Sequence, residues 1–227
     1  MFPLTGVGKF SPANLIKKQD ITELSKLLLN EKGELQIVSY ELLKPFTPEQ
    51  IAYFCNMNGF YSIPTTELVD FLREEIGEAN LEKTIEIAAG NGMMAKALGI
   101  KATDSFMQER EDVKSAYNKY GQPTVPYGEH VEKIDGNDAV RKYKPKVVVA
   151  SWCTHKFIPK ESWRGGNSLG VNEKLIIERV DKYIHIGNMD SHKNKPALAK
   201  KHRIVKADWI VSRSLDQSKN VIFIWEK

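Results

Sequence analysis

The sequence predicts an α/β fold with a doubly wound, mostly parallel sheet that ends in an antiparallel hairpin and carries an N-terminal helical cap. From residue 84 onward, short apolar runs rich in β-branched residues alternate with helical segments, which is typical of βαβ units. Near the end, the runs 208–213 and 221–225 are separated by a short polar turn, as in an antiparallel hairpin. We expect residues 1–61 to form the cap and residues 62–227 the α/β domain.

The elements of the cap are predicted from helix-start signals and apolar spacing. Residues 21–29 place their leucines on one face of a helix, and Asp20 precedes them as a cap. Thr47 is followed by a proline and, three residues after the cap, by Gln50, which is the pattern of a capping box. A third helix is expected over residues 65–76, where Thr65 or Thr66 is the cap.

The strands of the sheet are expected where apolar runs are short and end in turns. The clearest one is residues 146–150, a nearly continuous apolar run with three valines, as in the interior strands of parallel sheets. The other expected strands are 84–89, 100–103, 131–134 and 183–186, with helices between them near 94–98, 105–120, 136–142 and 173–179.

Composition limits the classes of protein that fit. The chain has 227 residues, 41% of them hydrophobic and 27% charged, which is ordinary for a globular protein. The net charge of +4 permits nucleic acid as a partner without favouring it. There is no apolar run long enough to span a membrane, no secretory signal in residues 1–10 and only two cysteines. We therefore expect a cytoplasmic protein with no membrane partner and no metal.

The most informative motif is the glycine turn at residues 86–95, where a strand meets Gly90, Asn91 and Gly92 and then a helix. Glycines allow a sharp turn and a close ligand approach, and the helix start offers free N–H donors. One interpretation is the dinucleotide pattern G-x-G-x-x-G/A, with Asp104 binding a ribose diol. However, Asp104 lies fourteen residues after Gly90, whereas that pattern expects about twenty.

The other interpretation includes Glu86, the acidic residue inside the strand. With it, the segment resembles the first motif of the class I S-adenosylmethionine-dependent methyltransferases, an acidic-x-G-x-G-x-G pattern in which Ala88 replaces the first glycine. The resemblance continues at Asp104, Asp135 and Ser151, which follow the second, third and fourth expected strands. It extends over about residues 62–227 and includes an antiparallel last strand. It implies a Rossmann-like fold.

This resemblance implies S-adenosylmethionine as the cofactor and methyl transfer to an unidentified acceptor. The cofactor's carboxylate would lie at the helix start near Asn91 and Gly92, and its ribose diol at Asp104. Asp135 would contact adenine, and Glu86 would lie near the cofactor's positive charges. The implied cofactor-binding residues are therefore Glu86, Ala88, Gly90, Asn91, Gly92, Asp104, Asp135 and Ser151.

The sequence indicates fewer residues for the part of the site that would bind the methyl acceptor. Trp152 and His155 follow the fourth expected strand and are candidates for the acceptor pocket, whereas Cys153 is expected to be inert. The prolines typical of enzymes that methylate base amino groups are absent, and no catalytic residue is identified. Helix capping remains the alternative role for Asp104 and Asp135. Two other functions stay open, a nicotinamide-dependent oxidoreductase and a non-catalytic cofactor-binding module that uses the basic run 193–206 to bind nucleic acid.

Overall fold

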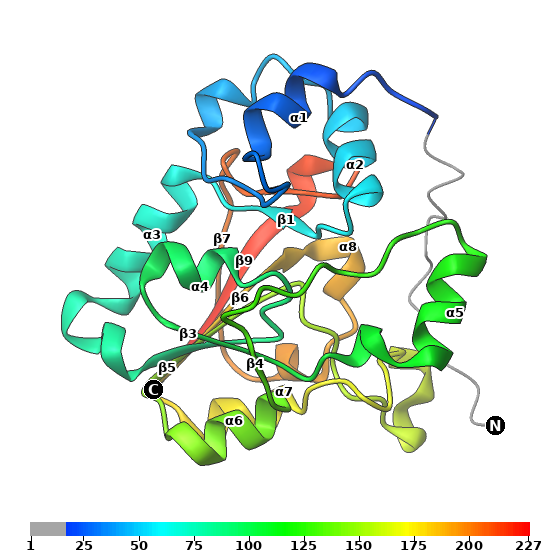
Figure 1. The fold of residues 1–227 in the computed structure, drawn as a ribbon. Helices are drawn as coiled ribbons and strands as arrows, with labels where there is room; N and C mark the ends of the chain where they lie inside the picture. The colour runs from blue at the N-terminus through cyan, green and yellow to red at the C-terminus, as the bar shows by residue number, and fades with distance from the viewer. Residues whose placement is uncertain (1–16) are drawn as a thin grey trace.

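The computed structural model describes residues 17–227 (Figure 1), so the prediction that residues 1–10 hold no secretory signal lies outside the described residues, as does part of the predicted cap. Within the described part, a central seven-stranded sheet has the strand order β4-β3-β2-β5-β6-β9-β7. Its strands are β2 (Thr84–Ile87), β3 (Lys101–Asp104), β4 (Glu132–Lys133), β5 (Val147–Ser151), β6 (Lys182–Asn188), β7 (Arg203–Val205) and β9 (Asn220–Glu226).

The pairing within the sheet confirms the predicted α/β class and the antiparallel last strand. The strands from β4 to β6 run parallel, whereas β9 is antiparallel to both β6 and β7. The antiparallel pair at the end is therefore formed by residues 203–205 and 220–226, and the prediction that 208–213 supplies its first strand is wrong. That run contains β8 (Val211–Ser212), which pairs with β1 (Ser62–Ile63) in a separate two-stranded sheet.

The backbone of residues 209–210 explains this difference, because its carbonyl groups have side-chain partners in place of a neighbouring strand. The carbonyl of Trp209 accepts a hydrogen bond from the hydroxyl of Thr65, and that of Ile210 accepts one from the amide of Asn220. An apolar run shows that a strand is favourable, but it does not specify the partner.

Helices cover both faces of the sheet. On one face, α3 (Thr66–Ile76) and α4 (Met93–Leu98) pack against Val147 and Val149 of β5. On the other face, α6 (Gly136–Tyr143) and α7 (Glu173–Arg179) pack against Val148 and Ala150. Because successive strand residues point to opposite faces, a strand buried on both faces must be apolar throughout, as the sequence predicted.

The remaining elements are shorter or lie outside these two layers. The α-helices are α1 (Thr22–Leu28), α2 (Pro48–Met57), α5 (Glu111–Lys119) and α8 (Met189–His192). The 3₁₀ helices are η2 (Tyr40–Leu42), η3 (Glu78–Lys83), η4 (Met107–Glu109), η5 (Pro159–Arg164), η6 (Pro196–Ala199) and η7 (Gln217–Lys219). Within residues 17–227, none of these helices combines the length and the apolar composition that crossing a bilayer requires.

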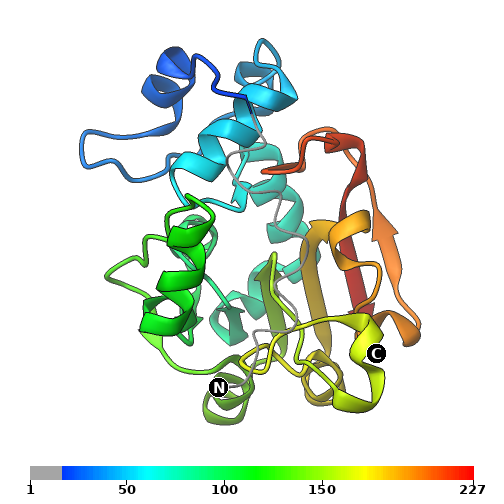
Figure 2. The ribbon, with the colours of Figure 1, turned by 90° about the vertical axis from the view of Figure 1, so that its right-hand side faces the viewer.

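The described part of the predicted cap contains α1 and α2, drawn in blue and cyan over the carboxyl ends of the parallel strands (Figures 1 and 2). The predicted capping box is present, because Thr47 and Gln50 exchange side-chain and backbone hydrogen bonds. The cap has an apolar cluster of its own, which includes Leu24 and Phe54 and extends to Ile63 and Val211. This cluster places the cap directly above the edge of the sheet where the strands end.

Candidate functional site

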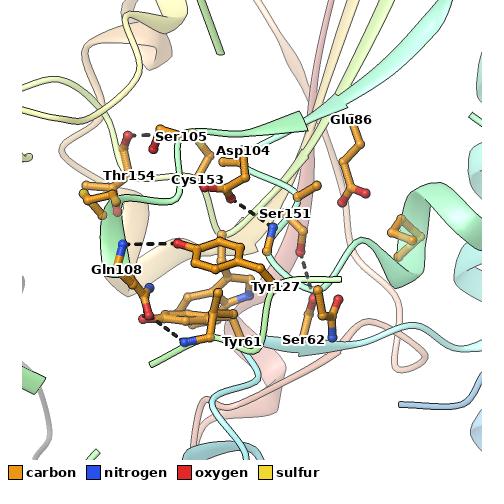
Figure 3. A pocket seen from close by; sticks show the side chains of 18 of the residues that line it. Tyr61, Ser62, Glu86, Asp104, Ser105, Gln108, Tyr127, Ser151, Cys153 and Thr154 are labelled. Atoms are coloured by element: carbon orange, nitrogen blue, oxygen red, sulfur yellow. Dashed lines mark hydrogen bonds between the residues drawn. The ribbon is translucent and has the colours of Figure 1, made fainter. Parts of the chain in front are cut away.

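A cleft of about 970 Å³, its open mouth included, lies at the carboxyl ends of β2, β3 and β5 (Figure 3). Strands β3 and β4 are added to the sheet on one side of β2, and β5 and β6 on its other side. The point where the strand order switches therefore lies between β2 and β5. In open α/β sheets, ligands bind outside the carboxyl ends of the strands at such a switch point. Phe60 and Tyr61 of the cap and Ser62 of β1 close one side of the cleft.

The glycine turn forms one wall of the cleft. Ala88, Gly90 and Gly92 have φ angles of +50°, +56° and +70°, a region that residues with a side chain seldom adopt. Ala88 occupies the position where the methyltransferase pattern has a glycine, and its methyl group adds a steric cost of about 1–2 kcal/mol in this conformation. Ala88, Gly90 and Asn91 line the cleft, whereas Gly92 precedes α4 as its cap residue.

Glu86 is the acidic residue of β2 and lines the cleft although only 1% of its surface is exposed. Its Oε2 accepts a hydrogen bond of 2.9 Å from the backbone N–H of Ala95 in α4. Burial raises the pKa of Glu86 to about 8, because one backbone hydrogen bond does not offset the loss of water. A cation bound nearby would favour the charged form, so Glu86 is suited to a positively charged ligand.

Asp104 ends β3 and joins the glycine turn to the loop that follows β3. Its Oδ2 accepts from the N–H of Gly90 at 3.0 Å, and its Oδ1 accepts from the N–H of Phe106 at 2.8 Å. Burial raises the pKa of Asp104 despite these bonds. Asp104 therefore stabilises local backbone and also lines the cleft, where each carboxylate oxygen has a further lone pair for a ligand hydroxyl.

Besides Gly92, two predicted site residues do not line this cleft. Asp135 caps α6 by accepting hydrogen bonds from the N–H groups of Asn137 and Asp138, and it is not among the residues that line the cleft. His155 lies on a separate cavity beside Glu173, and burial lowers its pKa. The structure therefore gives Asp135 the helix-capping role that the sequence left open as its alternative.

Ser151 and Trp152 extend the cleft on its other side, as the sequence predicted for residues after the fourth parallel strand. The hydroxyl of Ser151 lies 2.8 Å from that of Ser62, so this hydrogen bond links β5 to β1 (Figure 3). Trp152 has a φ of +53°, and its ring lies 6.1 Å from that of Tyr61, tilted by 49°. The positive φ turns the chain sharply at the end of β5 and places the indole in the wall of the cleft.

Sequence reasoning missed a group of aromatic and amide side chains that complete the cleft. The hydroxyls of Tyr61 and Tyr117 lie 2.7 Å apart, and the amide nitrogen of Gln108 donates to Tyr61 at 3.3 Å. The ring of Tyr127 stacks on that of Phe106 with the centroids 4.1 Å apart and the planes 6° apart. Tyr61 lies far in the sequence from the stretch 106–127 that holds the others, and no local motif indicates that they meet.

A buried charged network lies behind the end of β5. The ammonium of Lys195 donates to Glu173 and to the backbone carbonyl of Cys153, both at 2.7 Å, and the hydroxyl of Tyr183 donates to Glu173 at 2.7 Å. Burial raises the pKa of the Cys153 thiol, which fits the expectation that it is inert. Within residues 17–227, no cluster of three His, Cys, Asp or Glu side chains is arranged to hold a metal ion.

No protein-family model matches the chain, and no curated protein does. Among solved structures, the chain is similar to an rRNA methylase from Streptococcus thermophilus, with 14% identity over 70% of this chain and 93% of that one and a TM-score of 0.37. It is also similar to precorrin-6y C5,15-methyltransferase from Geobacter metallireducens, with 9% identity over 73% and 90% of the two chains and a TM-score of 0.39. A third is a ribosomal protein L11 methylase from Lactobacillus delbrueckii, with 17% identity over 71% and 79% and a TM-score of 0.34. These TM-scores are low, so the function is inferred below from the topology and the cleft of this chain.

Proposed function

We propose that this protein is an S-adenosylmethionine-dependent methyltransferase of the class I kind. The observation that carries the proposal is the position of the glycine turn and Asp104 at the carboxyl ends of the adjacent strands β2 and β3, in a sheet whose last strand is antiparallel. The family resemblance predicted this combination from the order of the motifs. Ser151 and Trp152 follow β5, the neighbour of β2 on its other side, and face the same cleft.

Within the proposed site, each residue meets a different part of the cofactor. The backbone N–H groups near Asn91 suit its carboxylate, and Asp104 suits the hydroxyls of its ribose. Glu86 suits its positive charges. When bound, the cofactor supplies a methyl group on a sulfonium leaving group. The chain contributes orientation, exclusion of water and a wall that holds the acceptor in line with that methyl group.

The sheet topology favours this function over a nicotinamide-dependent oxidoreductase. A complete dinucleotide-binding fold combines two parallel βαβαβ halves. Here the described parallel strands end with β6, and the next position in the sheet is occupied by the antiparallel β9. The second half of a dinucleotide site is therefore incomplete, which leaves the methyltransferase as the better-supported proposal.

Titration calorimetry with S-adenosylmethionine, S-adenosylhomocysteine and NAD tests the proposal directly. We expect both adenosyl compounds to bind and NAD to bind much more weakly. Binding of NAD alone would refute the proposal. Binding of both adenosyl compounds without methyl transfer to any fraction of a cell extract would instead indicate a non-catalytic cofactor-binding module.

A glycine pair provides a matched control for the location of the site. A Cβ atom added at Gly90 would lie 3.2 Å from Val125 in the cleft wall, whereas one added at Gly33, in the cap, has no neighbour within 4 Å. Both glycines have positive φ, so Gly90→Ala and Gly33→Ala carry a similar backbone cost. We expect only Gly90→Ala to weaken binding of S-adenosylmethionine. Equal affinity of the two variants would separate the glycine turn from the cofactor.

A further inference from the structure

The charges that line the cleft restrict the acceptor. Among the described residues that line it, Glu86 and Asp104 carry the only carboxyl groups, and there is no lysine, arginine or histidine. A phosphate or carboxylate on the acceptor would therefore meet no cation and would lie near two acidic groups. Nucleic acids bind through contacts between phosphates and Lys or Arg, so the lining disfavours them as acceptors that enter this cleft.

The side of the cleft away from the glycine turn is aromatic and uncharged. Phe60 and Tyr61 of the cap and Tyr117 of α5 lie on the lining together with Trp152. The hydroxyl of Tyr61 is already hydrogen-bonded to Tyr117 and Gln108. The guanidinium of Arg213 already lies over the Tyr61 ring, 4.6 Å from its centroid. Aromatic rings attract a positive charge, and the other rings of this wall offer that attraction to a ligand.

The same lining lacks a group that would take a proton from the acceptor. His155 lies on the other cavity, and His185 and His192 are buried outside the residues that line the cleft. The two carboxyl groups of the cleft are placed at the glycine turn, where the proposed function assigns them to the cofactor. An acceptor that must lose a proton in order to react, such as an alcohol, has no base in this wall.

We propose that the acceptor is a small, uncharged aromatic heterocycle whose nucleophile is a pyridine-type ring nitrogen, and that the product is an N-methylated cation. This inference rests on the proposed function. The lone pair of the nitrogen forms the new N–C bond, and the C–S bond breaks with its electron pair going to sulfur. The positive charge moves from sulfur to nitrogen, and no proton leaves. A neutral substrate becomes a cation beside aromatic rings, which attract that charge.

The first test measures binding of defined probes in the presence of saturating S-adenosylhomocysteine. The probes are quinoline, its product form N-methylquinolinium, and quinoline-2-carboxylate, which share one ring system and differ in charge. We expect N-methylquinolinium to bind about tenfold or more tightly than the carboxylate, with quinoline between them. Absence of binding by N-methylquinolinium, or a preference for the carboxylate, would overturn the inference.

Two tryptophan variants test whether N-methylquinolinium binds in the cleft. Trp152→Leu removes a ring from the cleft, whereas Trp163→Leu removes a ring that is 66% exposed and does not line the cleft. We expect the preference for N-methylquinolinium to decrease in Trp152→Leu and to remain unchanged in Trp163→Leu. Equal preferences in the two variants would assign the binding to another surface.

The second test follows radiolabelled methyl groups from S-adenosylmethionine into a cell extract treated with the purified protein. We expect label in a small molecule that a cation exchanger retains at pH 11, because a quaternary ring nitrogen keeps its charge there. Label in RNA, in protein, or in a small molecule that is uncharged at pH 11 would refute the inference while supporting the proposed methyl transfer. Failure of S-adenosylmethionine to bind in calorimetry would refute the proposed function itself, so the two failures are distinguishable.

Discussion

Glu86 makes a measurable prediction about stability, because its carboxyl group is buried without an ion-pair partner among the described residues. Its neighbours are the backbone N–H of Ala95, which favours the charged form, and the carboxyl of Asp104, which disfavours it. Burial has the largest effect and raises the pKa from its ordinary value of 4.5 to about 8. In the unfolded chain the same group titrates near its ordinary value.

The sign and size of the effect follow from proton linkage. Between about pH 4.5 and pH 8, the folded protein holds a proton on Glu86 that the unfolded chain has released, so the free energy of unfolding decreases as the pH rises. A tenfold difference in proton affinity corresponds to about 1.4 kcal/mol. The stabilisation present below pH 4.5 is therefore lost by roughly pH 8, and its full size is on the order of 5 kcal/mol.

The perturbation is Glu86→Gln, which keeps the size of the side chain and an oxygen that can accept from Ala95 but removes the titration. Urea denaturation at pH values from 5 to 9 would give the free energy of unfolding of the variant and of the unsubstituted protein. We expect the variant to gain stability relative to the unsubstituted protein as the pH rises. The control is Glu31→Gln at an exposed position of the cap. Parallel curves for Glu86→Gln and the unsubstituted protein would refute the reasoning.

Three further predictions concern the cofactor, the acceptor side and the buried charges. Asp104→Asn should weaken the binding of S-adenosylmethionine at least about tenfold in calorimetry, because hydrogen bonds to a charged group contribute roughly 1.5–3 kcal/mol each. Unchanged affinity in a folded variant would mean that Asp104 only holds the local backbone. Trp152→Ala should change cofactor affinity by only a few fold and greatly reduce methyl transfer, and a collapse of affinity would place Trp152 in the cofactor site. Lys195→Met should cost about 3–5 kcal/mol in chemical denaturation, because it leaves Glu173 buried and unpaired. Adding Glu173→Gln to it should recover part of that loss, and no recovery would contradict the charge argument.

The parts of the fold that sequence predicted well are those fixed by local chain properties. Val147 to Ala150 face apolar side chains on both sides of the sheet, and that environment selects a continuous β-branched run. The glycines of the turn correspond to positive φ angles, which the sequence indicates directly. Asp104 lies next to the glycine turn because β3 runs parallel to β2 and ends beside it, and its contact with a cofactor stays a prediction.

Where the sequence prediction differed from the structure, two arrangements use the same local pattern. The sequence pattern of an aspartate before a helix is the same whether its side chain caps that helix or contacts a ligand. In the structure Asp135 caps α6. His155 is only three residues from Trp152 and forms a backbone bridge to Val171, which lines both cavities, but the histidine itself lines only the second cavity. Proximity in the chain therefore does not place two side chains in one pocket.

The aromatic wall of the cleft depends on contacts that no local pattern encodes, and the cap contributes part of that wall. Tyr61 lies where the cap joins β1, Tyr117 in α5 and Trp152 at the end of β5, and they meet only because the cap lies over the strand ends. The glycine turn and Asp104 carry the resemblance to the methyltransferase pattern on which the proposed function rests. The wall opposite them is specific to the way this chain places its cap. We therefore expect changes in Gly90 and Asp104 to alter cofactor affinity and changes in Tyr61 to alter the choice of acceptor.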